Sequence, residues 1–258
     1  MWVLETVAVA FGMYSALSVP RVEWTKRNMS YALAAFPLIG AVQGLLWWGA
    51  CLLSRELALP VILRGALLCV LPVVVTGGIH LDGYADTCDA RASHASPERR
   101  QEILRDPHCG AFAVIRLCVY FVSYFALCCA WEPTDGGLLR MGLGFILSRT
   151  VSALCLAWLP VAAGSSLART FADAAARKRV RVLLGLLLAA LLAAAVLTGV
   201  PAGCAMLCAA LAVTLHYRHT ALREFGGTSG ALAGWFLVRA EFWMLAALVA
   251  VQYGEKMP

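Results

Sequence analysis

The chain has 258 residues, of which 61% are hydrophobic and 14% are charged, and its mean hydropathy is +0.77. An ordinary soluble domain carries about 25% charged residues, so this composition excludes most water-soluble folds and favours the lipid bilayer as the solvent. The net charge of +6 does not indicate nucleic-acid binding, because the basic residues form short clusters between apolar runs without interleaved aromatic residues.

The N-terminal segment, Trp2 to Leu17, is apolar but contains Glu5 and lacks a basic beginning. It is therefore a poor secretory signal peptide, and its acidic residue discourages a full crossing of the bilayer. We expect this segment to lie in the membrane interface or to form a re-entrant helix.

Seven further runs are apolar and approach or exceed the roughly 20 residues that a spanning helix needs. They are Tyr31–Leu53, Leu57–Val75, Ala111–Trp131, Leu138–Leu159, Val182–Thr198, Ala202–Leu215 and Leu232–Tyr253. Glycine and proline residues separate many of them, for example Gly136-Gly137 and Gly226-Gly227. The sequence predicts an all-α, polytopic helical bundle that forms a single membrane domain over residues 1–258.

The basic residues predict the orientation of this bundle. If the segment around Arg21 is cytoplasmic, 14 of the 21 lysines and arginines fall on the cytoplasmic side and three on the opposite side, with four inside the spans. Cytoplasmic segments of membrane proteins carry such an excess. We therefore expect the polar segment 76–110 to face the cytoplasm.

This polar segment contains four of the six aspartates. Asp82, Asp86 and Asp89 are spaced i, i+4, i+7 and would share one side of a helix. Like charges at this spacing destabilise a helix unless a cation lies among them, and carboxylates with substrate phosphates suit Mg²⁺. The spacing predicts that the three aspartates bind Mg²⁺, and Gly83 beside them would let a phosphate approach the backbone. A solvated polar loop is the alternative.

A second charged group follows on a predicted short helix. Ser96 suits its cap and Pro97 its first position. Arg99, Glu102 and Asp106 would share one face, with Arg105 adjacent and Gly110 leading into the next span. Arginine side chains suit phosphate recognition. By itself such a face is most often solvated surface, but beside the aspartates it predicts the second half of a diphosphate site for phosphoryl transfer.

The segment from Thr76 to Asp89, followed by Glu98 to Asp106 and Gly110, closely resembles the adenosylcobinamide-GDP ribazoletransferases, also called cobalamin synthases. Further matches extend the resemblance over nearly the whole chain. They are Ser18-Val-Pro20, Phe36 to Gly40, Ser148-Arg149 and Gly226 to Gly230.

The resemblance implies a Mg²⁺-dependent enzyme of the prokaryotic cytoplasmic membrane. This family joins adenosylcobinamide-GDP to α-ribazole or its 5′-phosphate and releases GMP, the last joining step of cobalamin biosynthesis. It also implies roles in catalysis for His80 beside Asp82, Asp86 and Asp89. The substrate-binding residues that we expect are Gly83, Arg99, Glu102, Arg105, Asp106, Gly110, Arg149 and Glu241. Membrane lipid is a further expected partner, and self-association or contact with other enzymes of the pathway stays open.

The chain departs from the family pattern at several positions. The family usually has charged residues at the positions of Ala231, Val238 and Ala163. It has a glycine of the motif that begins at Thr76 at the position of Ala113. We still expect an active enzyme, because segment 76–110 keeps the charged residues of the central motif.

Two other readings remain at the level of sequence. A prenyl- or CDP-alcohol-type transferase also uses aspartates on membrane helices, but those prenyl transferases have two aspartate-rich motifs and this chain has one. A transporter or non-catalytic scaffold would more commonly show inverted repeats and polar groups at the membrane midplane. No repeat is evident here, and the charges gather in one surface segment.

Overall fold

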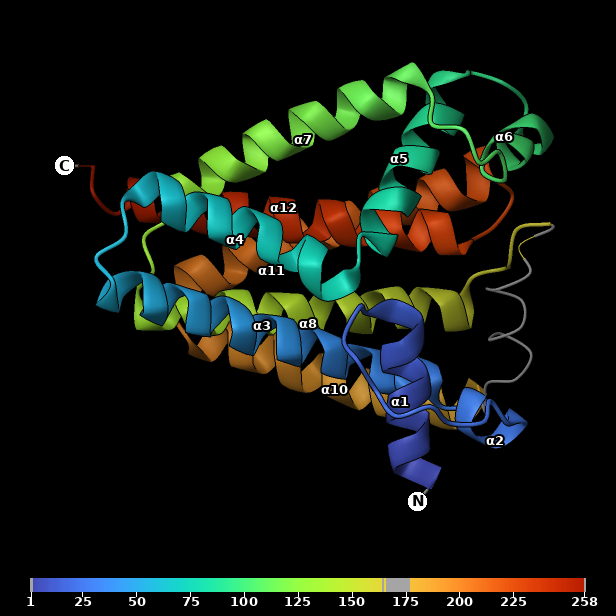
Figure 1. Cartoon of the computed structure of the whole chain (residues 1–258), viewed down its shortest axis with the longest axis horizontal. Coiled ribbons are helices and arrows are strands. Elements are labelled where there is room, and N and C mark those ends of the chain that lie inside the picture. The colour runs from blue at the N-terminus through green and yellow to red at the C-terminus, as the bar shows by residue number, and fades with distance from the viewer. Residues whose placement is uncertain (1, 164, 166–176, 258) are drawn as a thin grey trace.

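The computed structural model describes residues 2–163, 165 and 177–257, and within these ranges it is helical, with no strand. Figure 1 shows most of the long helices running in one general direction as a bundle. The helices are α1 (Trp2–Tyr14), α2 (Lys26–Met29), α3 (Ala32–Glu56), α4 (Val61–Thr76), α5 (Ile79–Ala92), α6 (Pro97–Ile103), α7 (Ala111–Ala130), α8 (Asp135–Trp158), α10 (Arg177–Leu197), α11 (Val200–Glu224) and α12 (Gly230–Gly254).

Six of these helices are long and apolar enough to cross a membrane, namely α3, α7, α8, α10, α11 and α12. The prediction of an all-α, multi-pass membrane protein is confirmed. The span predicted at Leu57–Val75 is shorter than expected. It corresponds to α4, which has 16 residues and reaches only about 24 Å, less than the roughly 30 Å of bilayer hydrocarbon. It meets the criteria of a span only together with α5, from which it is bent by 93°.

The bend between α4 and α5 lies at Gly77 and Gly78, whose φ angles are +64° and +81°. Side chains disfavour this left-handed region, so two successive glycines allow the sharp turn. As a result α5 lies across the bundle axis instead of continuing in the direction of α4 (Figure 1). The charge-dense helix is thereby held across the bundle, near the end where α6 lies.

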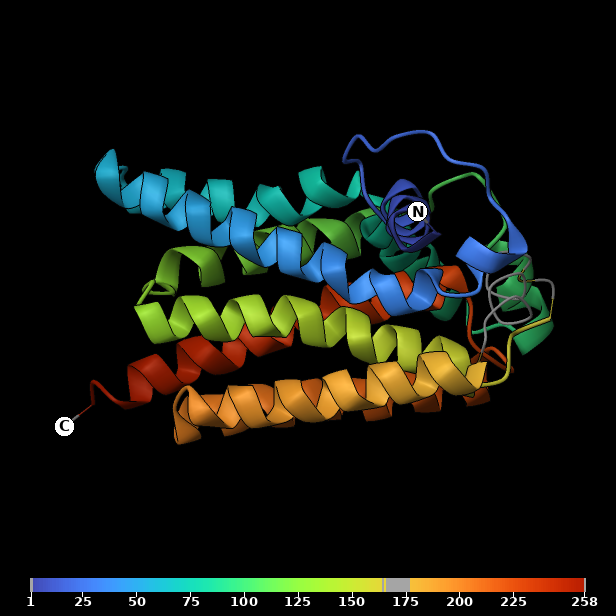
Figure 2. The ribbon, with the colours of Figure 1, turned by 90° about the horizontal axis from the view of Figure 1, so that it is seen from below.

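Helix α1 has 13 residues, too few to cross the hydrocarbon. It stands steeply against the bundle axis, and Figure 2 shows it almost end-on. The backbone N–H of Ala16, just after the helix, donates to the carbonyl oxygen of Val75 on α4 at 2.9 Å. The crosswise position agrees with the expected interfacial segment.

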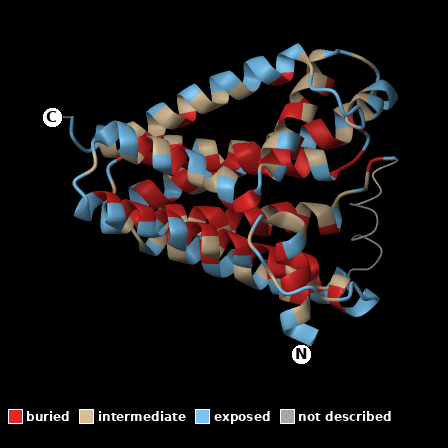
Figure 3. Cartoon of the chain, viewed as in Figure 1, coloured by how far each residue is buried: buried red, intermediate tan, exposed pale blue. Residues whose placement is uncertain are grey.

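The centre of the bundle is formed by α3, α8 and α12, where Figure 3 shows the buried residues concentrated. A Cβ atom at Gly40 of α3 would collide with the carbonyl of Phe145 on α8, so glycine permits this close crossing. Arg149 of α8 forms a buried ion pair with Glu241 of α12 and donates to the Gln43 side chain of α3 at 2.8 Å. One network of charge and amide groups therefore joins the three central helices.

Two sequence expectations about element boundaries need correction. Gly136-Gly137 lies in the first turn of α8, which begins at Asp135 after the Thr134 cap, rather than between elements. Helix α11 extends well beyond the predicted run Ala202–Leu215, because its polar C-terminal turns continue the helix to Glu224. The predicted break at Gly226-Gly227 is confirmed, with both residues at positive φ.

Candidate active site

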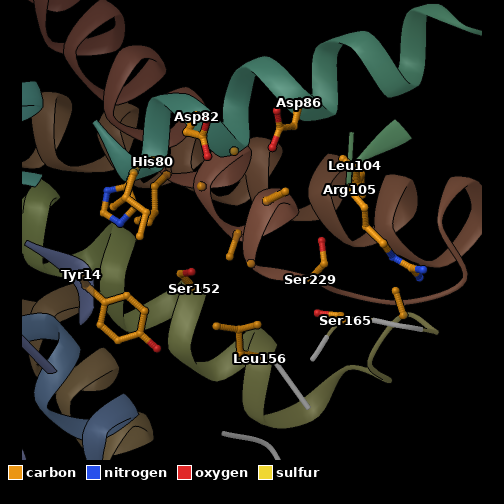
Figure 4. A pocket seen from close by; sticks show the side chains of 18 of the residues that line it. Tyr14, His80, Asp82, Asp86, Leu104, Arg105, Ser152, Leu156, Ser165 and Ser229 are labelled. Atoms are coloured by element: carbon orange, nitrogen blue, oxygen red, sulfur yellow. The ribbon is translucent and has the colours of Figure 1, made fainter. Parts of the chain in front are cut away.

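A cavity of about 390 Å³ lies beside α5. Asp82 and Asp86 stand one helical turn apart on the face of α5 that lines it, and Figure 4 shows both side chains directed into it. The other walls come from α1, α3, the end of α6, α8, residues 162, 163 and 165, and the beginning of α12. The cavity therefore gathers residues from nearly the whole length of the chain.

The carboxylates on α5 are close enough to disturb one another. Burial and the neighbouring carboxylates of Asp82 and Asp89 raise the pKa of Asp86 to about 6. Proximity of like charges in a partly dry site favours either a proton or a bound cation at this position. This electrostatic demand is the property expected where carboxylates receive a metal ion.

Asp89 does not share the cavity with the other two aspartates. Its two carboxylate oxygens accept hydrogen bonds from the backbone N–H groups of Gly110 at 2.6 Å and Ala113 at 2.8 Å. These are donors that the first turn of α7 leaves unpaired, so Asp89 caps α7 from a different helix. The described residues contain no group of three His, Cys, Asp or Glu side chains that could hold a metal ion. The expected three-aspartate ligand set is therefore not preassembled.

Two of the glycines in segment 76–110, Gly83 and Gly110, allow close packing in this structure. A Cβ atom at Gly83 would lie 2.7 Å from the carbonyl oxygen of Ala231 on α12, so Gly83 lets α5 pack directly against α12. A Cβ atom at Gly110 would lie 2.5 Å from the Asp89 carboxylate. Gly83 also lines the cavity, whereas Gly110 does not.

The short helix α6 brings only part of its charge to the cavity. It begins at the predicted cap, where Ser96 Oγ accepts a hydrogen bond from the N–H of Arg99. Arg105, just beyond the helix, lines the cavity and donates to the carbonyl oxygen of Ala163 at 3.1 Å. Arg99 and Glu102 pair with each other at 2.6 Å in the solvent, outside the cavity lining.

Asp106 also lies outside the cavity lining. Its carboxylate accepts from the backbone N–H of His108 and lies 2.7 Å from the ring nitrogen of the same residue. These hydrogen bonds hold the pKa of Asp106 below its usual value. Its substrate-binding role, like those of Arg99 and Glu102, stays a prediction.

His80 lies at the junction between the cavity and the bundle core. It lines the cavity, is buried, and packs edge-on against Phe36 with 5.9 Å between ring centroids. Arg149 and Glu241 lie behind it, around a small void that His80 also lines. Neither of these two residues reaches the main cavity, and their mutual ion pair uses the charges that were expected to contact substrate.

Sequence reasoning did not assign the three serines of the cavity wall, which are Ser152, Ser165 and Ser229. Ser152 is buried on α8, and its Oγ has no hydrogen-bond partner among the described residues. Ser229 caps α12 and belongs to the glycine-rich motif Gly226 to Gly230. A serine one turn beyond the Ser148-Arg149 pair was the available signal for Ser152, but its direction depends on the helix packing.

The departures from the family pattern also fall near the site. Ala163 and Ala231 line the main cavity, and Val238 lines the small void behind His80. Ala113 lies at the capped start of α7, where its N–H contacts Asp89. The first two changes therefore leave the cavity walls less charged than the family pattern would make them.

The amino-acid sequence is similar over nearly its whole length to a family of known proteins. The family model described as cobalamin-5-phosphate synthase matches residues 6–249. An adenosylcobinamide-GDP ribazoletransferase of Lachnoclostridium phytofermentans is 40% identical over 96% of this chain and 94% of its own length. Proteins of the same name from Ectopseudomonas mendocina and Clostridium botulinum are 32% and 30% identical, over 94% and 90% of this chain and 96% and 92% of their own lengths. No solved structure matches the chain.

The capping role of Asp89 predicts a separation between charge and hydrogen bonding. Asp89→Asn keeps one oxygen that can accept from the start of α7 but turns an NH2 group toward the second N–H, whereas Asp89→Ala removes both acceptors and should cost about 1–2 kcal/mol of stability. Thermal unfolding in detergent and turnover are measured for both variants. We expect Asp89→Asn to lie between wild type and Asp89→Ala in stability and to keep a turnover close to wild type, and a large loss of turnover in a stable Asp89→Asn protein would instead make the charge of Asp89 catalytic.

Proposed function

The chain belongs to the cobalamin-5-phosphate synthase family, and we propose that it joins adenosylcobinamide-GDP to α-ribazole, or to α-ribazole 5′-phosphate, with release of GMP. Family membership over nearly the full length favours this reaction over a prenyl- or CDP-alcohol-type transfer and over a transporter or scaffold. The single observation that carries the proposal is the cavity beside α5, where Asp82 and Asp86 face a space also lined by Arg105.

The reaction exchanges one phosphorus–oxygen bond for another. A ribose hydroxyl of α-ribazole forms a new bond to the phosphorus that carries the cobinamide. The bond from that phosphorus to the bridging oxygen of the diphosphate breaks, and GMP leaves with the bridging oxygen. The hydroxyl proton passes to a base. In-line transfer of this kind depends on holding the two oxygens in position and on stabilising charge at the diphosphate.

Asp82 and Asp86 are suited to hold Mg²⁺ together with substrate phosphate oxygens. The protein supplies two adjacent carboxylates rather than a closed ligand set, and Mg²⁺ is commonly bound by one or two carboxylates plus phosphates and water. The raised pKa of Asp86 supports the fit, because a cation relieves the repulsion that raises it. Bound there, the ion would neutralise charge on the diphosphate.

The remaining cavity residues orient the reactants. Arg105 lies in the wall and, among the described residues, hydrogen-bonds to a backbone carbonyl alone, so its guanidinium can turn to a phosphate oxygen. Ser152 presents an unpaired hydroxyl to the cavity, suited to a ribose or phosphate oxygen. His80 closes the inner end of the cavity beside Phe36.

The cavity holds only part of the larger substrate. A drug-sized ligand occupies roughly 300–1,000 Å³, and the cavity measures about 390 Å³. A corrinoid joined to a nucleotide is much larger than a drug-sized ligand. We therefore assign the diphosphate and the acceptor ribose to the cavity, and the corrin ring to the space outside its mouth.

The orientation that fits this reaction places α5 and α6 at the cytoplasmic face of a prokaryotic inner membrane. The excess of basic residues on that side supports it, and so does the cytoplasmic supply of nucleotide substrates. Self-association and contact with other enzymes of the pathway stay predictions.

Replacing either cavity carboxylate should lower turnover strongly. Asp82→Asn and Asp86→Asn each remove a charge that faces the diphosphate, and the loss of one charge-stabilising group typically costs at least about 10²-fold in kcat. The measurement is GMP release from adenosylcobinamide-GDP and α-ribazole by detergent-purified protein, with Mg²⁺ and with EDTA. Wild-type turnover in EDTA, or near-normal rates in both variants, would contradict the proposed carboxylate role.

The two arginines at either end of α6 provide a matched comparison. Arg105→Gln should lower turnover by about 10²-fold, because a cation in the cavity wall is lost. Arg99→Gln removes the same charge from a side chain that is 67% exposed, pairs with Glu102 and lies outside the cavity lining, so its turnover should fall much less than that of Arg105→Gln. Equal losses in the two variants would mean that general charge, rather than position in the cavity, matters.

Thiol labelling tests the orientation. In a Cys109→Ser background, Glu98→Cys at the α6 end and Asp135→Cys at the start of α8 introduce exposed thiols at opposite ends of the bundle. A membrane-impermeant maleimide should label position 135 in intact cells and position 98 only after lysis. The Cys109→Ser parent gives the background signal, and labelling of position 98 in intact cells would reverse the orientation.

A further inference from the structure

Helix α5 has a second face, directed away from Asp82 and Asp86. Tyr84, Cys88 and Arg91 are spaced i, i+4, i+7, and this row lies roughly opposite Asp82 and Asp86 around the helix. Helices α7 and α12 pack against α5, and Glu224 of α11 pairs with Arg91. The reaction proposed above uses none of these groups.

The indole of Trp235 on α12 is the centre of this basic cluster. The guanidinium carbon of Arg239 lies 4.4 Å from its ring centroid, and that of Arg91 lies 5.3 Å away. The ring of His216 on α11 lies 5.6 Å from the same indole. From α7, Arg116 shares one helix face with Ala113, whose N–H donates to Asp89, and with Tyr120, whose ring lies 5.6 Å from that of Tyr84. This face packs against α5, so Arg116 lies beside the same part of α5 as Cys88.

The cluster contains more positive charge than its acidic partner can balance. Glu224 of α11 pairs with Arg91 and with Arg100, each at 2.9 Å. Among the described residues, neither Arg116 nor Arg239 has a carboxylate within ion-pair distance. Arg239 Nη1 and His216 Nε2 are buried, and in the described part of the chain they have no hydrogen-bond partner. Buried polar atoms are nearly always paired, so these two atoms indicate a missing hydrogen-bond partner, which for the donor-only guanidinium of Arg239 must be an acceptor.

The surface next to the cluster is apolar and exposed. Trp243, one turn beyond Arg239 on α12, is 48% exposed, and Leu215, next to His216 on α11, is 56% exposed. Val119, three residues beyond Arg116 on α7, is 56% exposed as well. All three helices are long and apolar enough to cross a membrane, so lipid chains cover these side chains. The unpaired cations therefore lie at the edge of the lipid-facing surface.

We propose that the headgroup of an anionic phospholipid binds to this cluster, with its phosphate beside Arg239, His216 and Arg116. The phosphate would supply hydrogen-bond acceptors for the unpaired nitrogens and negative charge for the excess arginines. The acyl chains would lie over Val119, Leu215 and Trp243. A soluble phosphate offers the same headgroup chemistry but leaves the apolar border uncovered, which is why the lipid is favoured.

The lipid would stabilise the packing of α5 on the side opposite Asp82 and Asp86. It would contact α7, α11 and α12 together, and α5 packs against α7 and α12 with its carboxylates on the opposite side. The proposal concerns binding and stands independently of the reaction assigned to the cavity.

The experiment titrates detergent-purified protein with short-chain phosphatidylglycerol and, separately, with short-chain phosphatidylcholine, and reads binding by native mass spectrometry. Wild type should bind phosphatidylglycerol in preference to phosphatidylcholine. Arg239→Gln and Arg116→Gln should each weaken phosphatidylglycerol binding about fivefold, the effect expected for one cation near a membrane surface. Arg223→Gln is the matched control, because Arg223 is exposed on α11 beside Glu224 and forms no ion pair with any residue that the structure describes.

The outcomes separate the sources of the phosphate and the effects of folding. Each variant is first checked for a wild-type unfolding midpoint, and the exposed position of Arg116 keeps the test available if Arg239→Gln does not fold. Competition by inorganic phosphate at the lipid's own concentration would assign the cluster to a soluble anion and overturn the lipid proposal. Equal binding of the two lipids, or equal weakening by the Arg223→Gln control, would also overturn it.

Discussion

Three carboxylates on one helix cannot be accommodated in the hydrocarbon of a bilayer, and the rest of this structure follows from that constraint. After α3 the chain continues as the short helix α4. It then turns by 93° at Gly77 and Gly78, so that α5 lies across the bundle instead of continuing through it. The cavity, the docking of α6 and the basic cluster all form around this crosswise helix. Its position in turn depends on close backbone contact with α12, which Gly83 and Gly234 permit.

The buried pair of Arg149 and Glu241 fixes the surface on which α5 rests. A charged side chain within the membrane is costly unless it is paired, and here Gln43 and Ser148 complete the hydrogen bonding of the pair. Because the pair joins α8 to α12, it sets the separation of the two helices that supply Ser152 and Ser229 to the cavity. These two charged residues therefore shape the site from behind His80, without lining the main cavity.

The charged residues of segment 76–110 make different kinds of contact, although their spacing suggests a single site. Asp82 and Asp86 face the cavity. Asp89 instead caps the start of α7 and so connects α5 to the next membrane-spanning helix. Of the arginines that follow, Arg105 lines the cavity, and Arg100 instead helps to pair Glu224. A motif can therefore combine chemistry with the contacts that hold the chemistry in place, in residues only one or two turns apart.

The sequence by itself determined the membrane class, the helical bundle, the helix that carries the three aspartates and the cap at Ser96, because hydropathy, helical spacing and capping are local properties. It also singled out segment 76–110 as the expected place of the chemistry, since charge in so apolar a chain needs a reason. Only the tertiary structure decided which face of α5 lines a cavity, that Asp89 binds backbone N–H groups from residues 110 and 113, and that Arg149 meets Glu241. These outcomes depend on the 93° turn and on how closely helices distant in sequence approach, and no local pattern encodes that distance.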